Sequence, residues 1–453
     1  METPAWQLDI AGLNAAYARG VHGPESVLQS LLTAIAADAR GINAFCHLDA
    51  ETALDQARAS ARRWQQGQPL GPLDGVPVSI KDLLPVAGWP TRRGSRSTAG
   101  DPPAAQDAPL VAQLRAAGAV LFGKTSTTEF GWCVDSHNPH SGTTRNPRDP
   151  ARSAGGSSSG AAAQIAAGWG PLAIGSDAGG SVRLPASWCG VVGFKPSHGA
   201  IPAAPQSAFA EFAHFGPFTR SVADCATAMA VLAQPDARDP ASLYPRSTRP
   251  RPAPPTRLRI GWVEASADWQ PEIAQAYRRL LDQLSDAGHV LVAQPREDLA
   301  GVDAMWTVWA SRVHESFVDW SDAQRDLLDP ALRQLWEEGA AQAPATLARA
   351  RASLRALAGR VALQFAELDL QLTPATPTTA PLLAAQPAAQ PRNWFADNSL
   401  AYLFNLTQQP ALSQPLGQDA QGLPFNVQIT GRRYADELVL DFGRRIEARV
   451  AAA

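Results

Sequence analysis

Residues 155–181 read GGSSSGAAAQIAAGWGPLAIGSDAGGS, and this stretch carries the strongest indication of a fold class. Its serine–glycine start is typical of a loop, and the alanine-rich segment 159–167 predicts a helix. Residues 171–175 predict a short strand, which leads into a second glycine-rich turn at 178–181. A strand that alternates with a helix predicts an α/β domain, in which helices pack on a sheet.

The alternation continues on both sides of this stretch. Residues 8–66 have helical spacing throughout, 138–160 are typical of a loop, and prolines punctuate 234–257, which predicts an exposed connector. The expected strands are 75–81, 119–122, 259–263, 368–372 and 425–429, and the expected helices are 108–117, 271–287, 303–368 and 434–450.

Composition narrows the class of protein. The chain has 453 residues, of which 45% are hydrophobic and 18% charged, and this suits a single large domain spanning 1–453 or a domain with a substantial insert. A net charge of −3 without a basic block argues against binding to nucleic acid. No run of 18 apolar residues predicts a membrane span. We therefore expect a protein that contacts neither nucleic acid nor a membrane.

The cysteines and the N-terminus bear on the compartment. No basic segment followed by an apolar one begins the sequence, so we expect no secretory signal. The spacing of the cysteines favours neither a zinc site nor a disulfide framework, and no metal is expected. Reduced thiols in the cytoplasm are the simplest interpretation of these four residues, Cys46, Cys133, Cys189 and Cys225.

Two motifs point to other functions. Residues 118–125, GAVLFGKT, match a phosphate-binding loop, but a helix is expected before Gly118 and a strand between the two glycines, so we interpret them as helix–turn–strand. Residues 156–160, GSSSG, match the G-x-S-x-G elbow of α/β-hydrolases, with Ser158 as nucleophile. That elbow must follow a strand, and the preceding segment is loop. The α/β-hydrolase interpretation, with Ser158 as nucleophile, stays an alternative.

Three other features meet the needs of acyl transfer when they are taken together. Lys81 ends an expected strand, Ser157 lies in the serine–glycine loop, and Ser181 follows the pair Gly179 and Gly180. Each alone has an ordinary explanation as an exposed lysine, a linker or a helix cap. Together they supply a nucleophile, a base and backbone amides for an oxyanion. Burial of Lys81 would lower its pKa and leave a neutral amine that can act as a base.

These segments resemble the amidase signature family, which includes bacterial amidases and the glutaminase subunit of tRNA-dependent amidotransferases. The blocks that resemble the family are GVPVSIKD at 75–82, GGSSSGAAA at 155–163, GSDAGGSVRLPA at 175–186 and CGVVGFKP at 189–196. Weaker similarity extends over most of the chain. The resemblance implies an α/β fold with a large mixed β-sheet flanked by helices on both faces.

The resemblance also implies roles for individual residues. Ser181 would be the nucleophile that forms the acyl-enzyme, Ser157 the relay serine after a cis peptide bond, and Lys81 the base. The backbone amides of Ala178, Gly179, Gly180 and Ser181 would form the oxyanion hole, and no cofactor is implied. Asp177 and Arg183 are interpreted as structural. The departures at Ser159, Ser176 and Ala178 leave these roles in place.

The substrate is a small-molecule amide, ester, anilide or carbamate on this interpretation, since the chain has 13 tryptophans that could form an apolar pocket. The variable segments 132–142 and 300–400 would shape that pocket, the latter as a helical region. The candidates are Trp132, Trp306, Trp309, Trp394 and Phe395, with ordinary core packing as the alternative. A role as a glutaminase-type amidotransferase subunit is the other function left open, and a homodimer is common in the family.

Overall fold

The computed structural model describes residues 4–243, 257–384 and 391–452. An eleven-stranded mixed sheet crosses the molecule in the order β1-β3-β2-β6-β8-β7-β12-β13-β11-β9-β10. Its strands are β1 (Phe45–Leu48), β2 (Pro77–Lys81), β3 (Val120–Thr125), β6 (Leu172–Asp177), β7 (Val192–Lys195), β8 (His214–Thr219), β9 (Arg259–Val263), β10 (Val290–Gln294), β11 (Leu370–Pro374), β12 (Ala411–Gln418) and β13 (Pro424–Gly431). A separate hairpin pairs β4 (His137–Asn138) with β5 (Gly142–Thr143).

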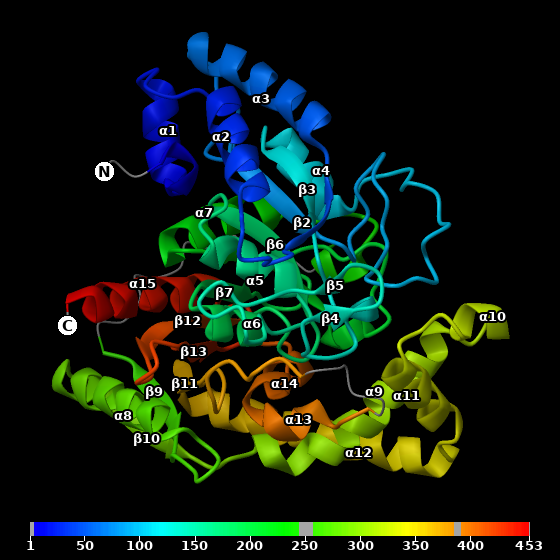
Figure 1. Ribbon diagram of the computed structural model, residues 1–453. Coiled ribbons are helices and arrows are strands. Elements are labelled where there is room, and N and C mark those ends of the chain that lie inside the picture. The colour runs from blue at the N-terminus through cyan, green and yellow to red at the C-terminus, as the bar shows by residue number, and fades with distance from the viewer. Residues whose placement is uncertain (1–3, 244–256, 385–390, 453) are drawn as a thin grey trace.

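Helices pack on the sheet between these strands. They are α1 (Ile10–Ala18), α2 (Pro24–Ala36), α3 (Ala50–Gln65), α4 (Pro109–Ala116), α5 (Ser159–Ala166), α6 (Arg183–Cys189), α7 (Val222–Leu232), α8 (Pro271–Asp286), α9 (Val302–Ser316), α10 (Asp322–Arg325), α11 (Pro330–Ala340), α12 (Pro344–Glu367), α13 (Trp394–Asp397), α14 (Ser399–Leu406) and α15 (Asp436–Ala452). In Figure 1, α1–α3 and α9–α12 lie at opposite ends of the molecule.

The alternation of side chains along the strands builds a core on each face of the sheet. Leu121 of β3 belongs to one core, whereas its neighbours Val120 and Phe122 belong to the other. The first core also contains residues of α4, α7, α8 and α15, and the second contains residues of α2, α3, α5 and α6. Helices therefore cover both faces, as the resemblance implied. A third cluster joins α9, α11, α12 and α14.

Three neighbouring strands run parallel and bring their carboxyl ends together. β2 pairs in parallel with β3 on one side and with β6 on the other. The register sets Ile80 opposite Ile174, so the end of β2 lies beside the last residues of β6. Loops that leave the carboxyl ends of adjacent parallel strands meet at one edge of a sheet, where open α/β sheets bind their ligands.

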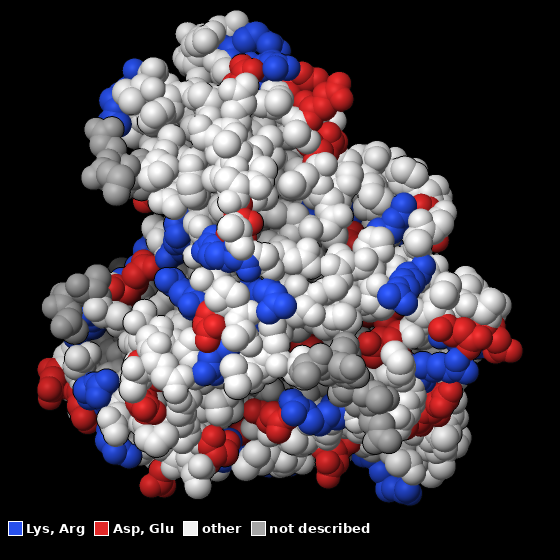
Figure 2. All heavy atoms as spheres, viewed as in Figure 1, with Lys and Arg blue, Asp and Glu red and all other residues white. Residues whose placement is uncertain are grey.

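The surface charge bears on the expectation that the protein does not bind nucleic acid, and the helices bear on the expectation that no segment spans a membrane. On the face shown in Figure 2, basic and acidic side chains are interspersed rather than gathered into one basic block. Within the described ranges, no helix combines the length and the apolar character that crossing a bilayer demands.

Most expected elements are present, and the differences have physical reasons. The region 8–66 contains β1 as well as helices, because Phe45–Leu48 pairs antiparallel with β3, far away in sequence. The loop 138–160 starts within the β4–β5 hairpin. Residues 118–125 form the expected turn and strand, so the phosphate-loop alternative does not hold. Part of the connector 234–257 lies outside the described residues.

Candidate active site

Lys81 reaches the site because of its position in β2. Val78 and Ile80 point into the first core, so Ser79 and Lys81 point to the opposite face. There Ser79 Oγ donates a hydrogen bond to Gln164 of α5. This contact holds α5 across the strand end, and the loop that enters α5 carries Ser157 and Ser158. All five residues of β2 are buried.

Three serine hydroxyls surround the amine of Lys81. Its Nζ lies 2.7 Å from Ser157 Oγ, 2.8 Å from Ser158 Oγ and 2.9 Å from Ser176 Oγ. The Gly156–Ser157 peptide bond is cis, as the resemblance implied. Gly156 leaves room for this geometry, because a Cβ there would lie 2.1 Å from the carbonyl oxygen of Asp135. The third hydroxyl of the loop, that of Ser159, instead donates to the carbonyl of Ser126.

The surroundings of Lys81 favour its neutral form. The side chain has 0% exposure, and burial lowers its pKa well below the ordinary value, although the charge of Asp177 acts in the opposite direction. The three hydroxyl partners are uncharged. A neutral amine has two N–H donors and one lone pair, so it can bond to all three hydroxyls.

Ser181 lies on the turn that follows β6, where Asp177 organises the backbone. The Asp177 carboxylate accepts bonds from the N–H groups of Gly180, at 2.7 Å, and Val182, at 3.1 Å. The guanidinium of Arg183 binds both oxygens of the same carboxylate at 2.9 Å. Both side chains have 0% exposure. Burial raises the pKa of Asp177, and the charge of Arg183 more than offsets this and keeps it below its usual range.

The same turn corrects one expectation about the oxyanion hole. The Gly180 N–H points to the Asp177 carboxylate, so it is not free to bind a developing oxyanion. Among the described residues, the N–H groups of Ala178, Gly179 and Ser181 have no acceptor. Ala178 and Ser181 both line one cavity, which we call the main cavity because Ser157 and Ser181 lie on its wall. A second cavity, of about 610 Å³, is lined by Asp135 and Trp394 among others. The available donors are therefore these three amides rather than four.

Trp394 and Phe395, two of the expected pocket residues, pack against Gly179 of this turn. A Cβ at Gly179 would lie 2.6 Å from the ring of Trp394 and 2.9 Å from that of Phe395, so only glycine fits between the turn and these rings. Trp394 and Phe395 are buried, and neither lines the main cavity. Neither side chain therefore contacts a substrate in the main cavity, because the glycine turn lies between them and that space. Trp394 instead lines the second cavity, and Phe395 lies in the core.

Of the other three tryptophans expected in the pocket, one lines the main cavity and two do not. Trp132 lines the cavity. Trp309 is core, since it stacks on Phe209 at 3.7 Å and its Nε1 donates to the carbonyl of Trp132. Trp306 packs against the helical cluster and is likewise absent from the cavity wall. Helical position alone does not show which face of α9 points to open space. Trp309 fits the core-packing alternative, and Trp306 is half-buried against the helical cluster.

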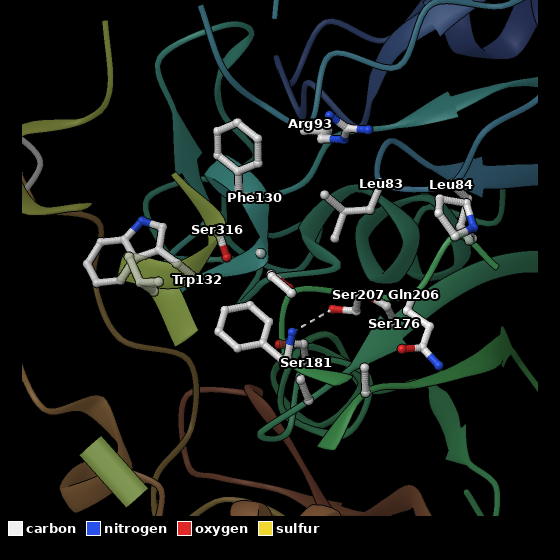
Figure 3. A pocket seen from close by; sticks show the side chains of 18 of the residues that line it. Leu83, Leu84, Arg93, Phe130, Trp132, Ser176, Ser181, Gln206, Ser207 and Ser316 are labelled. Carbon is white, nitrogen blue, oxygen red and sulfur yellow. Dashed lines mark hydrogen bonds between the residues drawn. The ribbon is translucent and has the colours of Figure 1, made fainter. Parts of the chain in front are cut away.

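The main cavity has a volume of about 470 Å³, within the range of small-molecule sites. Ser157, Ser176 and Ser181 lie on its wall, as Figure 3 shows for the last two. Part of the wall comes from α9 and α11 of the helical region. Several lining side chains were not expected from the sequence. They come from the segments that follow β2, β3 and α9: Leu83, Arg93, Phe130, Phe317 and Trp320.

Three of these missed residues form an aromatic wall. The ring centroids of Phe130 and Phe317 are 4.9 Å apart, and those of Phe317 and Trp320 are 4.6 Å apart. Phe130 ends the segment LFGKTSTTEF at 121–130, which belongs to the weaker similarity to the family outside its four main blocks. This signal could have indicated Phe130, but its contacts with a distant segment around Phe317 had no visible trace in the sequence.

The structure argues against Ser158 as a nucleophile. Its hydroxyl has 0% exposure and donates to the carbonyl of Ser176 at 3.1 Å. It does not line the main cavity, and no strand of the described chain leads into Gly156–Gly160. The α/β-hydrolase alternative is therefore wrong, because its elbow needs an exposed serine at the end of a strand.

Comparison with known sequences gives matches over almost the whole chain. Residues 26–440 match the model of the Amidase family. The chain is 33% identical over 439 residues to an acylamidase of Rhodococcus erythropolis, covering 94% of this chain and 92% of that protein. It is 32% identical over 475 residues to a glutamyl-tRNA(Gln) amidotransferase subunit of Chloroflexus aurantiacus, covering 97% of this chain and 96% of that protein.

Comparison with solved structures points to the same family as the sequence matches. The chain is similar to a bacterial aryl acylamidase described as belonging to the amidase signature enzymes. The two superpose with a TM-score of 0.88 at 27% identity, over 99% of this chain and 97% of the other. The mixed sheet and its flanking helices are therefore shared with a solved enzyme over their full extent.

Proposed function

The chain belongs to the amidase signature family and is a hydrolase of carbon–nitrogen amide bonds, and from this premise we propose that Ser181, Ser157 and Lys81 perform the reaction. The observation that carries the proposal is the contact of 2.7 Å between Ser157 and a fully buried lysine amine. Ser181 lies on the wall of the cavity beside them. Its backbone carbonyl accepts a bond from the Ser158 N–H at 3.3 Å, which ties the two serine loops together.

The hydrogen bonds around Lys81 favour proton transfer from Ser157 to the amine. The Ser158 proton is directed to the carbonyl of Ser176, so Ser158 Oγ accepts from Lys81. The second N–H of the amine is assigned to Ser176 Oγ. Its lone pair then faces Ser157, whose hydroxyl donates to it. A neutral lysine in this arrangement can draw a proton from Ser157, which is what a general base must do.

The proposed reaction begins when Ser157 takes the proton of Ser181 and passes its own to Lys81. Ser181 Oγ attacks the substrate carbonyl, and the amides of Ala178, Gly179 and Ser181 stabilise the oxyanion. The relay then runs in reverse: Ser157 protonates the leaving amine, the C–N bond breaks, and the acyl group stays on Ser181. Water, activated by the same relay, attacks the acyl-enzyme and releases the acid.

We also propose a preference for aryl or extended apolar amides. The wall of Phe130, Phe317 and Trp320 suits a flat apolar group, and burial of such a ring supplies binding energy. Anilides, aryl esters and carbamates share this shape, so a urethanase activity belongs to the same proposal. The helical region near 300–400, as part of a single domain, would shape specificity through α9 and α11.

The amidotransferase alternative leads to a different substrate preference. A glutaminase-type subunit takes a small polar substrate and delivers ammonia to a partner chain. Comparing kcat/KM for benzamides and anilides with that for malonamide and glutamine discriminates between the two roles. A preference for the polar set, or glutaminase activity only beside a partner, would favour the alternative.

All four cysteines are free, which supports a cytoplasmic location as a further part of the proposal.

Trapping of the acyl-enzyme tests the assignment of Ser181 directly. Rapid mixing with an aryl ester, followed by an acid quench, should leave the acyl group on the tryptic peptide 153–183. Fragmentation of that peptide should place the added mass on Ser181. An acyl group on Ser157 or Ser158 instead would refute the assigned order of the relay.

A further inference from the structure

Arg93 is a cation with no visible partner on the wall of the main cavity. Its side chain is half-buried and lines the cavity. Among the described residues, neither a carboxylate nor another acceptor is within bonding distance of its guanidinium. The nearby Asp82 is paired with Lys124 at 2.9 Å. In Figure 3, Arg93 and Phe130 lie across the cavity from Ser181.

The other charges on this wall are neutralised. Asp177 is bound by Arg183, and Glu315 contacts Arg312 at 3.0 Å and Arg351 at 3.6 Å. Lys81 lies behind this wall, where burial lowers its pKa well below the ordinary value and favours the neutral amine. The cavity, as far as the described residues line it, therefore carries one uncompensated positive charge, and a cleft lined by one sign of charge concentrates ligands of the opposite sign.

The backbone at Arg93 is conformationally strained. Arg93 has φ 54° and Phe130 has φ 50°, and both are in the left-handed region that non-glycine residues rarely adopt. The Arg93 N–H donates to the carbonyl of Asp82 at 3.1 Å, and the Arg93 carbonyl accepts from the Phe130 N–H at 2.8 Å. Strained residues that are linked to each other and line one cavity indicate a functional constraint.

We propose that Arg93 binds a carboxylate on the substrate, at the opposite end of the cavity from the scissile amide. The preferred substrate is then an amide that also carries an acid group, with an aromatic spacer between the two along Phe130 and Trp320. A guanidinium binds a carboxylate through two parallel hydrogen bonds, which gives both orientation and charge selectivity. This inference rests on the proposed nucleophile, since Ser181 defines the end where the amide binds.

A matched pair of substrates tests the inference. 4-Carbamoylbenzoate and 1,4-benzenedicarboxamide share ring and scissile amide and differ in a carboxylate against a neutral amide. The wild-type protein should prefer the carboxylate, and Arg93→Asn should lower the ratio of the two kcat/KM values by at least about tenfold, the effect of losing a charged hydrogen bond. Asparagine tolerates the left-handed backbone. Arg93→Lys should give an intermediate ratio, because it keeps the charge and loses the planar fork.

Controls separate this inference from the proposed function. Arg19→Asn removes an equal charge from the exposed end of α1 and should leave the ratio unchanged. Calorimetric Kd values for both compounds on Ser181→Ala, with and without Arg93→Asn, give the same comparison without turnover. A wild-type protein that prefers the diamide, or the same ratio in Arg93→Asn, would overturn the inference. Full turnover in Ser181→Ala would instead overturn the assigned nucleophile.

Discussion

The Oδ1 atom of Asp177 accepts a hydrogen bond of 2.7 Å from the N–H of Gly180. This contact removes one amide from the expected oxyanion hole and makes the carboxylate, rather than the glycines alone, responsible for the shape of the turn. Arg183 neutralises that carboxylate. It also reaches the carbonyl of Ala401 and the side chains of Asn405 and Gln428, so the turn is anchored to α14 and β13.

Removal of either partner of this ion pair should destabilise the protein strongly. Asp177→Ala leaves the Arg183 charge buried without a partner, and Arg183→Ala does the same to Asp177. Each should lower the free energy of unfolding in urea by about 3–5 kcal/mol. Arg58→Ala breaks ion pairs with Glu25 and Asp55 on the exposed surface and should change the free energy of unfolding far less, because water screens these charges. Equal effects of the buried and exposed changes would contradict this interpretation of the turn.

Ser181→Ala should lower kcat by about 10⁴-fold or more, because the acyl-enzyme cannot form. The matched control is Ser159→Ala in the neighbouring loop, whose hydroxyl contacts the carbonyl of Ser126 and is not one of the three hydroxyls bonded to the Lys81 amine. Its kcat should stay within a few-fold of the wild-type value. Steady-state kinetics on one anilide measures both. If the Ser159 variant lost activity and the Ser181 variant kept it, Ser181 would not be the nucleophile.

Activity should rise with pH and level off well below the ordinary lysine pKa of about 10.4. Burial lowers the pKa of Lys81, and only the neutral amine can accept the Ser157 proton. The pH profile of kcat/KM measures this ionisation. A limb that still rises toward pH 10 would show that the amine behaves as an exposed one. Lys81→Ala should have negligible activity at every pH in the range.

The same ionisation should be visible in stability. Between the lowered pKa of folded Lys81 and about 10.4, unfolding lets the exposed amine bind a proton, so the folded state gains stability as pH rises. The wild-type free energy of unfolding should therefore increase relative to that of Lys81→Met by about 1.4 kcal/mol per pH unit in this window. Urea unfolding at several pH values measures the difference. Parallel pH profiles for the two proteins would mean that Lys81 is charged when folded.

Trp320 and Trp309 should respond differently to truncation. Trp320 lines the cavity, so Trp320→Ala should raise KM for an anilide by about tenfold, as expected from the loss of apolar burial. Trp309 is 1% exposed and stacks on Phe209, so Trp309→Ala should cost about 3–5 kcal/mol of stability. KM values and thermal unfolding of both variants separate the two effects. An unchanged KM in Trp320→Ala would remove the aromatic wall from the proposed site.

The parts of the site that could be predicted from sequence share one property, which is that their chemistry lies in contiguous residues. The blocks around Lys81, Ser157 and Ser181 each combine a reactive side chain with the backbone that positions it. Strand alternation in 75–81 was enough to predict a strand that ends on the lysine, and the structure confirms it. The strand β1 was missed because its partner β3 lies far away in sequence.

Local pattern predicted the class of fold, because periodicity acts over a few residues. The short motifs that resemble the family predicted the type of bond that is cleaved and the residues proposed to cleave it. Which side chains surround the substrate depended on packing between distant segments. Trp309 packs in the core and Trp394 lies beside the second cavity, while Phe130, Trp320 and Arg93 reach the main cavity from separate loops. Burial and direction are properties of the assembled chain, since they depend on which surfaces exclude water from one another. The lowered pKa of Lys81 arises in the same way, from the desolvation that only the folded protein provides.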